Sequence, residues 1–196
     1  MREVELKSVV PDPDRTIATL RAAGAVPECD GRQSDARYDT AERALLARDH
    51  VLRLRVFTGT PAPSATLDWK GPTSVAGGYK VREELSSSTG DAGVLAQLLD
   101  RLGYVVIREI QRDIVQFAWL GATVRVERYP RMDALIEVEG EPAAIEAAIA
   151  GTQLPRTGFT SERLQDFVAR FEARTGQRAA LCDRELAGDY RYSANA

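Results

Sequence analysis

The chain has 196 residues and a formal net charge of −3; 28% of its residues are charged and 44% are hydrophobic. This length suits one domain with a substantial core, and the near balance of acids and bases argues against a general nucleic-acid binder. The two cysteines, Cys29 and Cys182, lack metal-ligand spacing and do not suggest a disulfide scaffold. Because His50 is the one histidine, any catalysis is expected to use carboxylates, basic side chains and bound metal.

No apolar stretch approaches the roughly 18 residues that span a bilayer, and the first residues, Met1 to Glu5, have no apolar signal region. We therefore expect a cytoplasmic protein with no membrane partner and no nucleic-acid partner. The sequence leaves the oligomeric state open, and a homodimer is one assembly that would fit it.

Seven segments are predicted to be strands, most of them because apolar and polar residues alternate with period two. They cover residues 3–7, 51–57, 65–70, 79–86, 104–119, 124–129 and 136–139. Two segments between them, 58–64 and 71–78, are rich in glycine, proline, serine and threonine, and are predicted to be loops.

Four helices are predicted from their start and stop signals over residues 12–23, 92–102, 141–150 and 161–175. The first begins Asp12-Pro13 and stops at Gly24, and the third is expected to stop at Gly151. After Gly176 no period is clear. We therefore expect one domain over residues 1–176 and a C-terminal extension over residues 177–196 that packs loosely.

The strands share one unusual property: each has a face made almost wholly of Glu, Arg or Lys, while the other face is apolar. On a single strand such a face normally points at water. If the sheet closes into a barrel with the helices outside, the apolar faces pack the helices and the charged faces must point inward. We therefore expect an α+β fold with an antiparallel barrel, because mixed acids and bases can be satisfied around a wet cavity.

The expected lining contains both acidic and basic side chains. The acids are Glu3, Glu5, Glu84, Glu127, Glu137 and Glu139. The bases are Lys7, Arg53, Arg55, Lys70, Lys80, Arg82, Arg108, Arg112 and Arg125. Carboxylate oxygens suit Mg²⁺ or Mn²⁺, and guanidinium forks suit phosphate oxygens. Together they indicate a site for a polyphosphate chelated by metal.

The motifs and their order resemble those of the CYTH superfamily, the triphosphate tunnel metalloenzymes, which includes class IV adenylate cyclases, thiamine triphosphatases and inorganic triphosphatases. Residues 3–7 fit its Glu-x-Glu-x-Lys opening. Further matches follow in the family's order: Tyr38-Asp39-Thr40, Leu52-Arg53-Leu54-Arg55, Leu67-Asp68-Trp69-Lys70-Gly71-Pro72, Arg82-Glu83-Glu84, Arg112, and the closing segment 132–139. The resemblance covers roughly residues 1–170.

The resemblance implies an eight-stranded antiparallel barrel open at both ends, with helices packed outside. It implies metal binding by Glu3, Glu5, Glu137 and Glu139, to which Glu127 is added although the family usually has aspartate there. It implies that phosphates bind Lys7, Arg53, Arg55, Lys70 and Arg112. The chain has Ile110 where the family often has lysine, and Arg108 on the same face is expected to substitute. As catalytic residues we predict Lys70, Arg112 and Glu84, the last either as a base or as a holder of a basic neighbour.

Three functions remain open at this stage. The first is metal-dependent hydrolysis of tripolyphosphate, thiamine triphosphate or another organic triphosphate, which needs only water as nucleophile. The second is conversion of ATP to cAMP and pyrophosphate by a class IV adenylate cyclase. The third is a non-catalytic module that binds polyphosphate or a nucleotide. An ordinary barrel with a solvated charged exterior is the structural alternative, and burial of Arg53 and Glu5 would exclude it.

Overall fold

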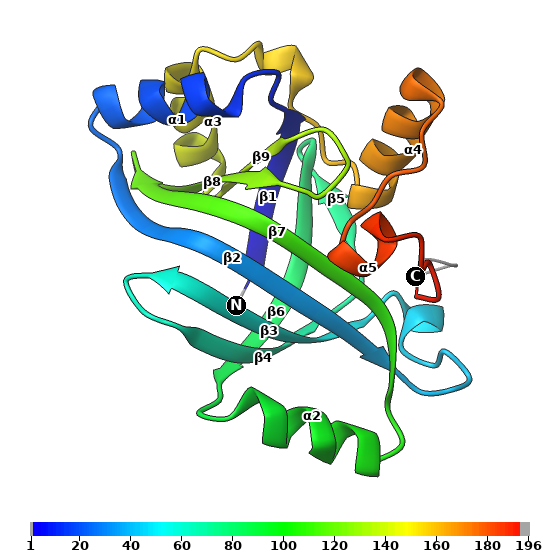
Figure 1. Ribbon diagram of the computed structural model, residues 1–196. Helices are drawn as coiled ribbons and strands as arrows, with labels where there is room; N and C mark the ends of the chain where they lie inside the picture. Colours follow the sequence, from blue (N-terminus) through cyan, green and yellow to red (C-terminus); the bar gives the residue numbers. More distant parts are fainter. Residues whose placement is uncertain (1, 193–196) are drawn as a thin grey trace.

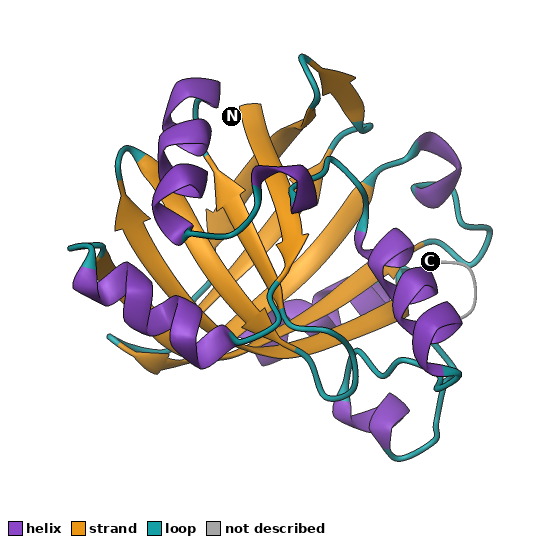
Figure 2. Ribbon diagram, turned by 90° about the horizontal axis from the view of Figure 1, so that it is seen from above, coloured by secondary structure: helices purple, strands orange, loops and turns teal. Residues whose placement is uncertain are grey.

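The computed structural model describes residues 2–192. Its centre is a closed antiparallel β-barrel (Figures 1 and 2). Around the barrel the strands run in the order β1 (Arg2–Val9), β9 (Leu135–Glu139), β8 (Ala122–Arg128), β7 (Val105–Trp119), β2 (Val26–Asp39), β3 (Val51–Thr60), β4 (Ser64–Lys70) and β6 (Tyr79–Ser88). Pairing of β1 with β6 closes the ring, and a short strand, β5 (Ser74–Ala76), pairs with β6 beyond the end of β4. The predicted barrel is confirmed.

The register of the strands sets the charged residues side by side on the inner face. Glu5 of β1 is opposite Lys80 of β6 on one side and opposite Glu139 of β9 on the other. Arg55 of β3 is likewise opposite Asp35 of β2. Because alternate residues of a strand point to opposite faces, every apolar neighbour of these residues points outward.

The outward apolar side chains of β1, β8 and β9 form the main core. Leu6, Val124, Ile136 and Val138 are at most 1% exposed, and they pack with residues of α1 (Pro13–Ala22) and α3 (Pro142–Thr152). A smaller cluster around Leu54 lies beneath α2 (Ala92–Arg101). In Figure 1, α1 and α3 lie together above the barrel and α2 lies below it. The helices are therefore outside, and the inner face is left to the charged residues.

Side-chain caps fix the starts of two helices where the sequence predicted them. Asp12 accepts a hydrogen bond from the backbone N–H of Arg15 at 2.9 Å, and Asp91 does the same for Val94 at 2.9 Å. Such a bond satisfies one of the otherwise unpaired N–H groups of the first turn. The third helix, α3, passes the predicted stop and ends at Thr152.

Gly151 therefore has a packing role in place of the predicted stop. A Cβ atom at Gly151 would lie 1.9 Å from the ring of Trp119, far inside van der Waals contact. The glycine lets the indole, at the end of β7, lie directly against α3. The left-handed residue after the helix is Gln153, with a φ of 62°.

Part of the segment after Gly176, residues 179–185, packs closely against the barrel. Ala180 and Leu181 are at most 2% exposed. The carbonyl of Leu181 accepts a hydrogen bond from the N–H of Gln111 in β7 at 2.7 Å, and Ala180 forms an isolated bridge with Arg131. The expectation of loose packing is therefore wrong for residues 179–185, and residues 193–196 of the expected extension lie outside the described residues. The segment includes a short helix, α5 (Asp183–Leu186).

The remaining elements are α4 (Leu164–Thr175) and two 3₁₀ turns, η1 (Leu46–Arg48) and η2 (Arg156–Gly158). Phe167 and Phe171 form the buried stripe of α4, as their spacing predicts. Within residues 2–192, no helix has the length and apolar character needed to cross a membrane.

Candidate active site

A cavity of about 300 Å³ occupies the interior of the barrel. It is lined by ten arginines and lysines and eight carboxylates, contributed by the inner faces of the strands and by residues near η1 and α4. Every predicted site residue lines this cavity except Arg108, which is buried on β7 at 5% exposure. Glu5 and Arg53 are 2% and 7% exposed, which excludes a barrel with its charged faces in solvent.

One side of the cavity is a cluster in which three lysines lie between carboxylates. The Nζ of Lys70 lies 2.6 Å from Glu3 and 2.9 Å from Glu84. Lys7 lies 2.8 Å from Glu5 and also donates to Glu137. Lys80 completes the cluster by donating a hydrogen bond to Glu5. These residues come from β1, β4, β6 and β9, and the barrel closure brings them together.

Two carboxylates of this cluster carry opposite pKa shifts. Burial, together with the nearby carboxylates Glu137 and Glu3, raises the pKa of Glu139 to about 7. Burial also acts to raise the pKa of Glu137, but Lys7 and Arg125 outweigh it and hold that pKa well below its usual range. Glu139 therefore lies in a locally negative environment even though the cavity as a whole has more bases than acids.

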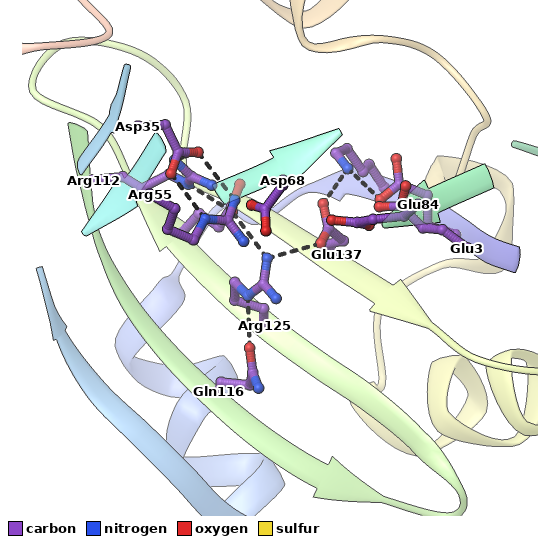
Figure 3. Close-up of polar contacts among 12 residues, drawn as sticks. Glu3, Asp35, Arg55, Asp68, Glu84, Arg112, Gln116, Arg125 and Glu137 are labelled. Atoms are coloured by element: carbon purple, nitrogen blue, oxygen red, sulfur yellow. Dashed lines mark hydrogen bonds and ion pairs between the residues drawn. The ribbon is translucent and has the colours of Figure 1, made fainter. Parts of the chain in front are cut away.

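The other side of the cavity is organised around Asp35 on β2 (Figure 3). Asp35 accepts hydrogen bonds from Arg55 at 2.8 Å and from Arg112 at 3.0 Å, and Arg53 lies 3.7 Å away. Burial acts to raise the pKa of Asp35, but the arginines, led by Arg55, hold it well below its usual range. One carboxylate thus spaces three guanidinium groups across β2, β3 and β7.

Further contacts join the arginines to the rest of the wall. Arg112 donates to Glu127 at 2.8 Å, whose other oxygen accepts from the hydroxyl of Tyr129 at 2.6 Å. Arg125 donates to Gln116 at 2.8 Å and to Glu137 at 3.0 Å, which connects the arginine side to the lysine side (Figure 3).

The guanidinium fork of Arg53 is held by Asp68. It donates to one oxygen of Asp68 through Nε at 2.9 Å and through Nη2 at 2.6 Å, and Nη2 lies 3.3 Å from Glu84. Asp68 also accepts from the hydroxyl of Ser86 at 2.6 Å. This fixes the orientation of the guanidinium before any ligand arrives.

A family model described as the CYTH domain matches residues 1–149. The chain belongs to the CYTH family. A search of curated proteins found no match.

Solved structures share the fold at low sequence identity. A candidate adenylate cyclase from Vibrio parahaemolyticus has a TM-score of 0.72 and 18% identity, over 85% of this chain and 97% of that one. A Pyrococcus horikoshii protein has a TM-score of 0.70 and 20% identity, over 86% and 98%. A Hippeastrum protein described as a candidate adenylyl cyclase with a dominant triphosphatase activity has a TM-score of 0.60 and 17% identity, over 91% and 98%. At these identities the likeness shows the CYTH fold.

The carboxylates of this CYTH tunnel fit a divalent cation by their chemistry. Glu3 has a buried oxygen, Oε2, with no hydrogen-bond partner among residues 2–192, and Glu139 is crowded by other carboxylates. Oxygen donors of this kind suit Mg²⁺ or Mn²⁺. Among residues 2–192, no three His, Cys, Asp or Glu side chains are already gathered as a metal-binding group. Lys7, Lys70 and Lys80 lie among these carboxylates.

Some of the predicted phosphate ligands are already engaged with the protein. Arg82 donates to the backbone carbonyls of Gly71 at 2.7 Å and Asp49 at 2.6 Å. It lines the cavity of the CYTH tunnel, but it also ties two loops to the barrel wall. Arg55 and Arg112 donate to Asp35, and Arg125 donates to Glu137 (Figure 3).

Several residues of the CYTH site were not among those predicted from the sequence. Asp35 and Arg37 are on β2, which was not predicted as a strand; Asp68 is on a predicted strand but was left out of the lining. Arg163, just before α4, reaches the cavity mouth and lies 2.8 Å from Asp49. The period-two series Gln33, Asp35, Arg37 was the available signal for β2.

A second, less polar pocket shares part of the cavity wall, and we call it the apolar opening. It is lined by Phe57, Pro61 and Ile114 together with Cys29. Arg55 and Arg125 belong to the lining of both this opening and the main cavity. A ligand whose phosphates lie against these arginines could therefore extend an uncharged group toward this opening.

Proposed function

We propose that this protein is a divalent-metal-dependent enzyme that hydrolyses a triphosphate, either inorganic tripolyphosphate or a small organic triphosphate. The observation that carries the proposal is the division of the tunnel wall into a carboxylate-rich side and an arginine-rich side around one cavity. Ten bases against eight acids leave the lining favourable to an anion although the whole chain has a net charge of −3.

The arginine side would bind phosphate oxygens. Asp35 holds Arg55 and Arg112 apart, and Asp68 holds Arg53, so that their free N–H groups stay directed into the tunnel. Guanidinium groups that are fixed in advance lose little freedom when they bind an anion. Charge that builds up on the leaving phosphate would be stabilised by groups that need not reorganise.

The lysine side would hold the metal and the rest of the phosphate chain. Glu3, Glu5, Glu137 and Glu139 would provide the metal ligands, with Glu127 as a further carboxylate beside Arg112. These carboxylates would hold Mg²⁺ or Mn²⁺, which would supply Lewis-acid stabilisation of the phosphate charge. Lys7, Lys70 and Lys80 would then exchange their carboxylate partners for phosphate oxygens, because both partners are anionic and lie in the same cavity.

The contacts of Glu84 support its role as a holder of basic neighbours. Glu84 lies 2.9 Å from Lys70 and 3.3 Å from Arg53. Each oxygen of Glu84 therefore already faces a cation of the cavity wall. We therefore assign Glu84 to positioning Lys70 and Arg53, and we retain Lys70 and Arg112 as residues that touch the reacting phosphate.

Class IV adenylate cyclase activity is the second candidate. Two observations favour it: the Vibrio and Hippeastrum structures carry cyclase in their descriptions, and the second opening has an apolar lining that could take a nucleoside. Hydrolysis is preferred because it needs only a water molecule in line with phosphorus, whereas cyclisation needs the ribose 3′-hydroxyl to be held there.

The test is to identify the products formed with Mg²⁺ or Mn²⁺ from tripolyphosphate, thiamine triphosphate and ATP, each assayed separately. Orthophosphate from any of them, without cAMP, is the expected result. Formation of cAMP with pyrophosphate from ATP would replace the hydrolase by the cyclase. Binding without any product would contradict both and leave a module that only binds polyphosphate or a nucleotide.

A further inference from the structure

Arg37 occupies an unusual position on the inner wall of the barrel. On β2 it is directly opposite Arg53 of β3 on one side and Arg108 of β7 on the other. Residues opposite each other in an antiparallel pair have Cβ atoms about 5 Å apart on the same face. Arg108, Arg37 and Arg53 therefore form a row of three arginines across three neighbouring strands, which we call the arginine row.

Like charges directly opposite each other destabilise a sheet unless other charges compensate them. For Arg53 that compensation is present, since Asp68 and Glu84 hold its guanidinium. Arg37 differs: among residues 2–192 its side chain forms no ion pair within 4.0 Å, and its Nε is buried with no hydrogen-bond partner. A buried charged donor left unpaired costs free energy, so the row is incomplete as it stands.

The electrostatics of Arg37 agree with this geometry. Burial, then Arg108, then Arg53 lower the pKa of Arg37 to about 9. The side chain still carries its charge at neutral pH. An anion beside it would supply the missing partner and relieve the repulsion within the row.

The position of Arg37 in the tunnel indicates which part of a ligand would reach it. Along β2 the inward residues run from Gln33 through Asp35 to Arg37, toward the mouth lined by His50 and Arg163. The apolar opening around Phe57 lies at the other end, because Phe57 is opposite Gln33. A linear phosphate chain lying against Arg55 and Arg112 would thus have one end pointing to the arginine row and the other to the apolar opening.

We propose that Arg37, with Arg53, forms a further binding subsite that takes the terminal phosphoryl group of the substrate. The inference rests on the proposed function and deepens it, since it predicts the orientation of the substrate in the tunnel. The phosphate end of the substrate lies toward the mouth at Arg163, and any organic group lies toward the apolar opening at Phe57.

The test is the affinity for inorganic tripolyphosphate, measured by calorimetry in EDTA, for the wild-type chain and for Arg37→Gln. Arg32→Gln is the matched control, because Arg32 is on the same strand but faces outward, where its partners Asp113 and Asp183 are well exposed. We expect Arg37→Gln to weaken binding about tenfold or more, and Arg32→Gln to change it less than about twofold.

The melting temperature without ligand separates binding from structure. Relief of the unpaired charge predicts that Arg37→Gln is at least as stable as the wild type, while the rise in melting temperature caused by tripolyphosphate becomes smaller. Arg37→Lys, which keeps the charge but lacks the fork, should bind with an intermediate affinity.

Equal affinity of wild type and Arg37→Gln would overturn the subsite, as would a loss of stability in Arg37→Gln that accounts for its weaker binding. If the wild type itself fails to bind tripolyphosphate in EDTA, the subsite is also overturned. Turnover of a triphosphate by that same wild-type protein with Mg²⁺ would still support the proposed function, so the two failures are distinguishable.

Discussion

Lys70 donates a hydrogen bond to Glu3 at 2.6 Å across the inside of the barrel, although the two residues belong to β4 and β1. The bond spans β6, the strand that pairs with both. A predicted phosphate ligand and a predicted metal ligand thus neutralise each other inside the barrel. The same arrangement recurs for Lys80 with Glu5 and for Lys7 with Glu137. Ligand binding is therefore an exchange of partners, in which a phosphate and its metal replace internal ion pairs.

Arg53→Ala should weaken substrate binding and should also lower the stability of the folded protein. Loss of one charged hydrogen bond to phosphate is expected to cost about 1.5–3 kcal/mol of binding free energy. Removal of the fork also leaves Asp68 buried at 2% exposure without its cation, which should lower the free energy of unfolding by about 3–5 kcal/mol. The Michaelis constant and urea unfolding measure the two effects, and Arg21→Ala, at an exposed arginine on α1, is the control.

The double variant Arg53→Met with Asp68→Leu separates these two effects. It removes both charges together, so most of the lost stability should return. Binding should stay as weak as in Arg53→Ala, because the phosphate contact is still missing. Recovery of both properties would contradict a role of Arg53 in binding phosphate.

Glu139 should make the metal-free protein less stable as the pH rises. Its pKa in the folded chain is about 7, against an ordinary value of 4.5. A group whose pKa is raised by folding contributes its full stability below about pH 4.5 and loses that contribution as the pH rises through about 7. Urea unfolding in EDTA measures the free energy of unfolding at pH 5 and at pH 8. Between these two pH values the wild type should lose more of that free energy than Glu139→Gln does. Identical losses in the two proteins would show that Glu139 is not the group responsible.

Truncation after Gly176 should destabilise the barrel. It removes the buried residues Ala180 and Leu181 and the hydrogen bond from Gln111 to the carbonyl of Leu181. Burial of one leucine side chain alone contributes about 1.5–3 kcal/mol. A chain ending at residue 176 should therefore unfold at a lower urea concentration than a chain ending at residue 192. Coincident unfolding curves would mean that the C-terminal segment adds nothing to the stability of the barrel.

The strands with a clean alternation could be predicted from the sequence, and so could their inward faces. Leu52-Arg53-Leu54-Arg55 and Glu3-Val4-Glu5-Leu6-Lys7 have apolar residues on one face because helices and core cover that face. The charged residues on the other face then follow from barrel closure. Most of the residues that line the cavity can be predicted in this way from the sequence.

Strand β2 could not be found in the same way. Its outward residues include Ser34 and Ala36, which give little apolar contrast to the inward Asp35 and Arg37. Much of its stabilisation comes from pairing with β7 and β3 on its two sides, a property of the tertiary fold. Because β2 was missed, so was Asp35, the carboxylate that organises the arginine side.

The ion pairs inside the cavity were also beyond sequence reasoning. The sequence predicts that the side chains of Lys7 and Arg125 point into the barrel. That both form ion pairs with Glu137 depends on how β1, β8 and β9 are staggered around the barrel. The close packing of Gly151 against Trp119 likewise depends on the meeting of two distant segments. From the local sequence alone, Gly151 is predicted to end the helix.

The most direct test of the central claim compares the wild type with Glu5→Gln in the hydrolysis of tripolyphosphate at saturating Mg²⁺. Glu5 lies between Lys7 and Lys80 and is 2% exposed, and glutamine keeps its shape while removing its charge. If the carboxylate cluster holds the metal, turnover should fall by about 100-fold or more, while circular dichroism and the cooperative unfolding of the variant remain those of a folded protein. Turnover of tripolyphosphate by Glu5→Gln at the wild-type rate would contradict the account.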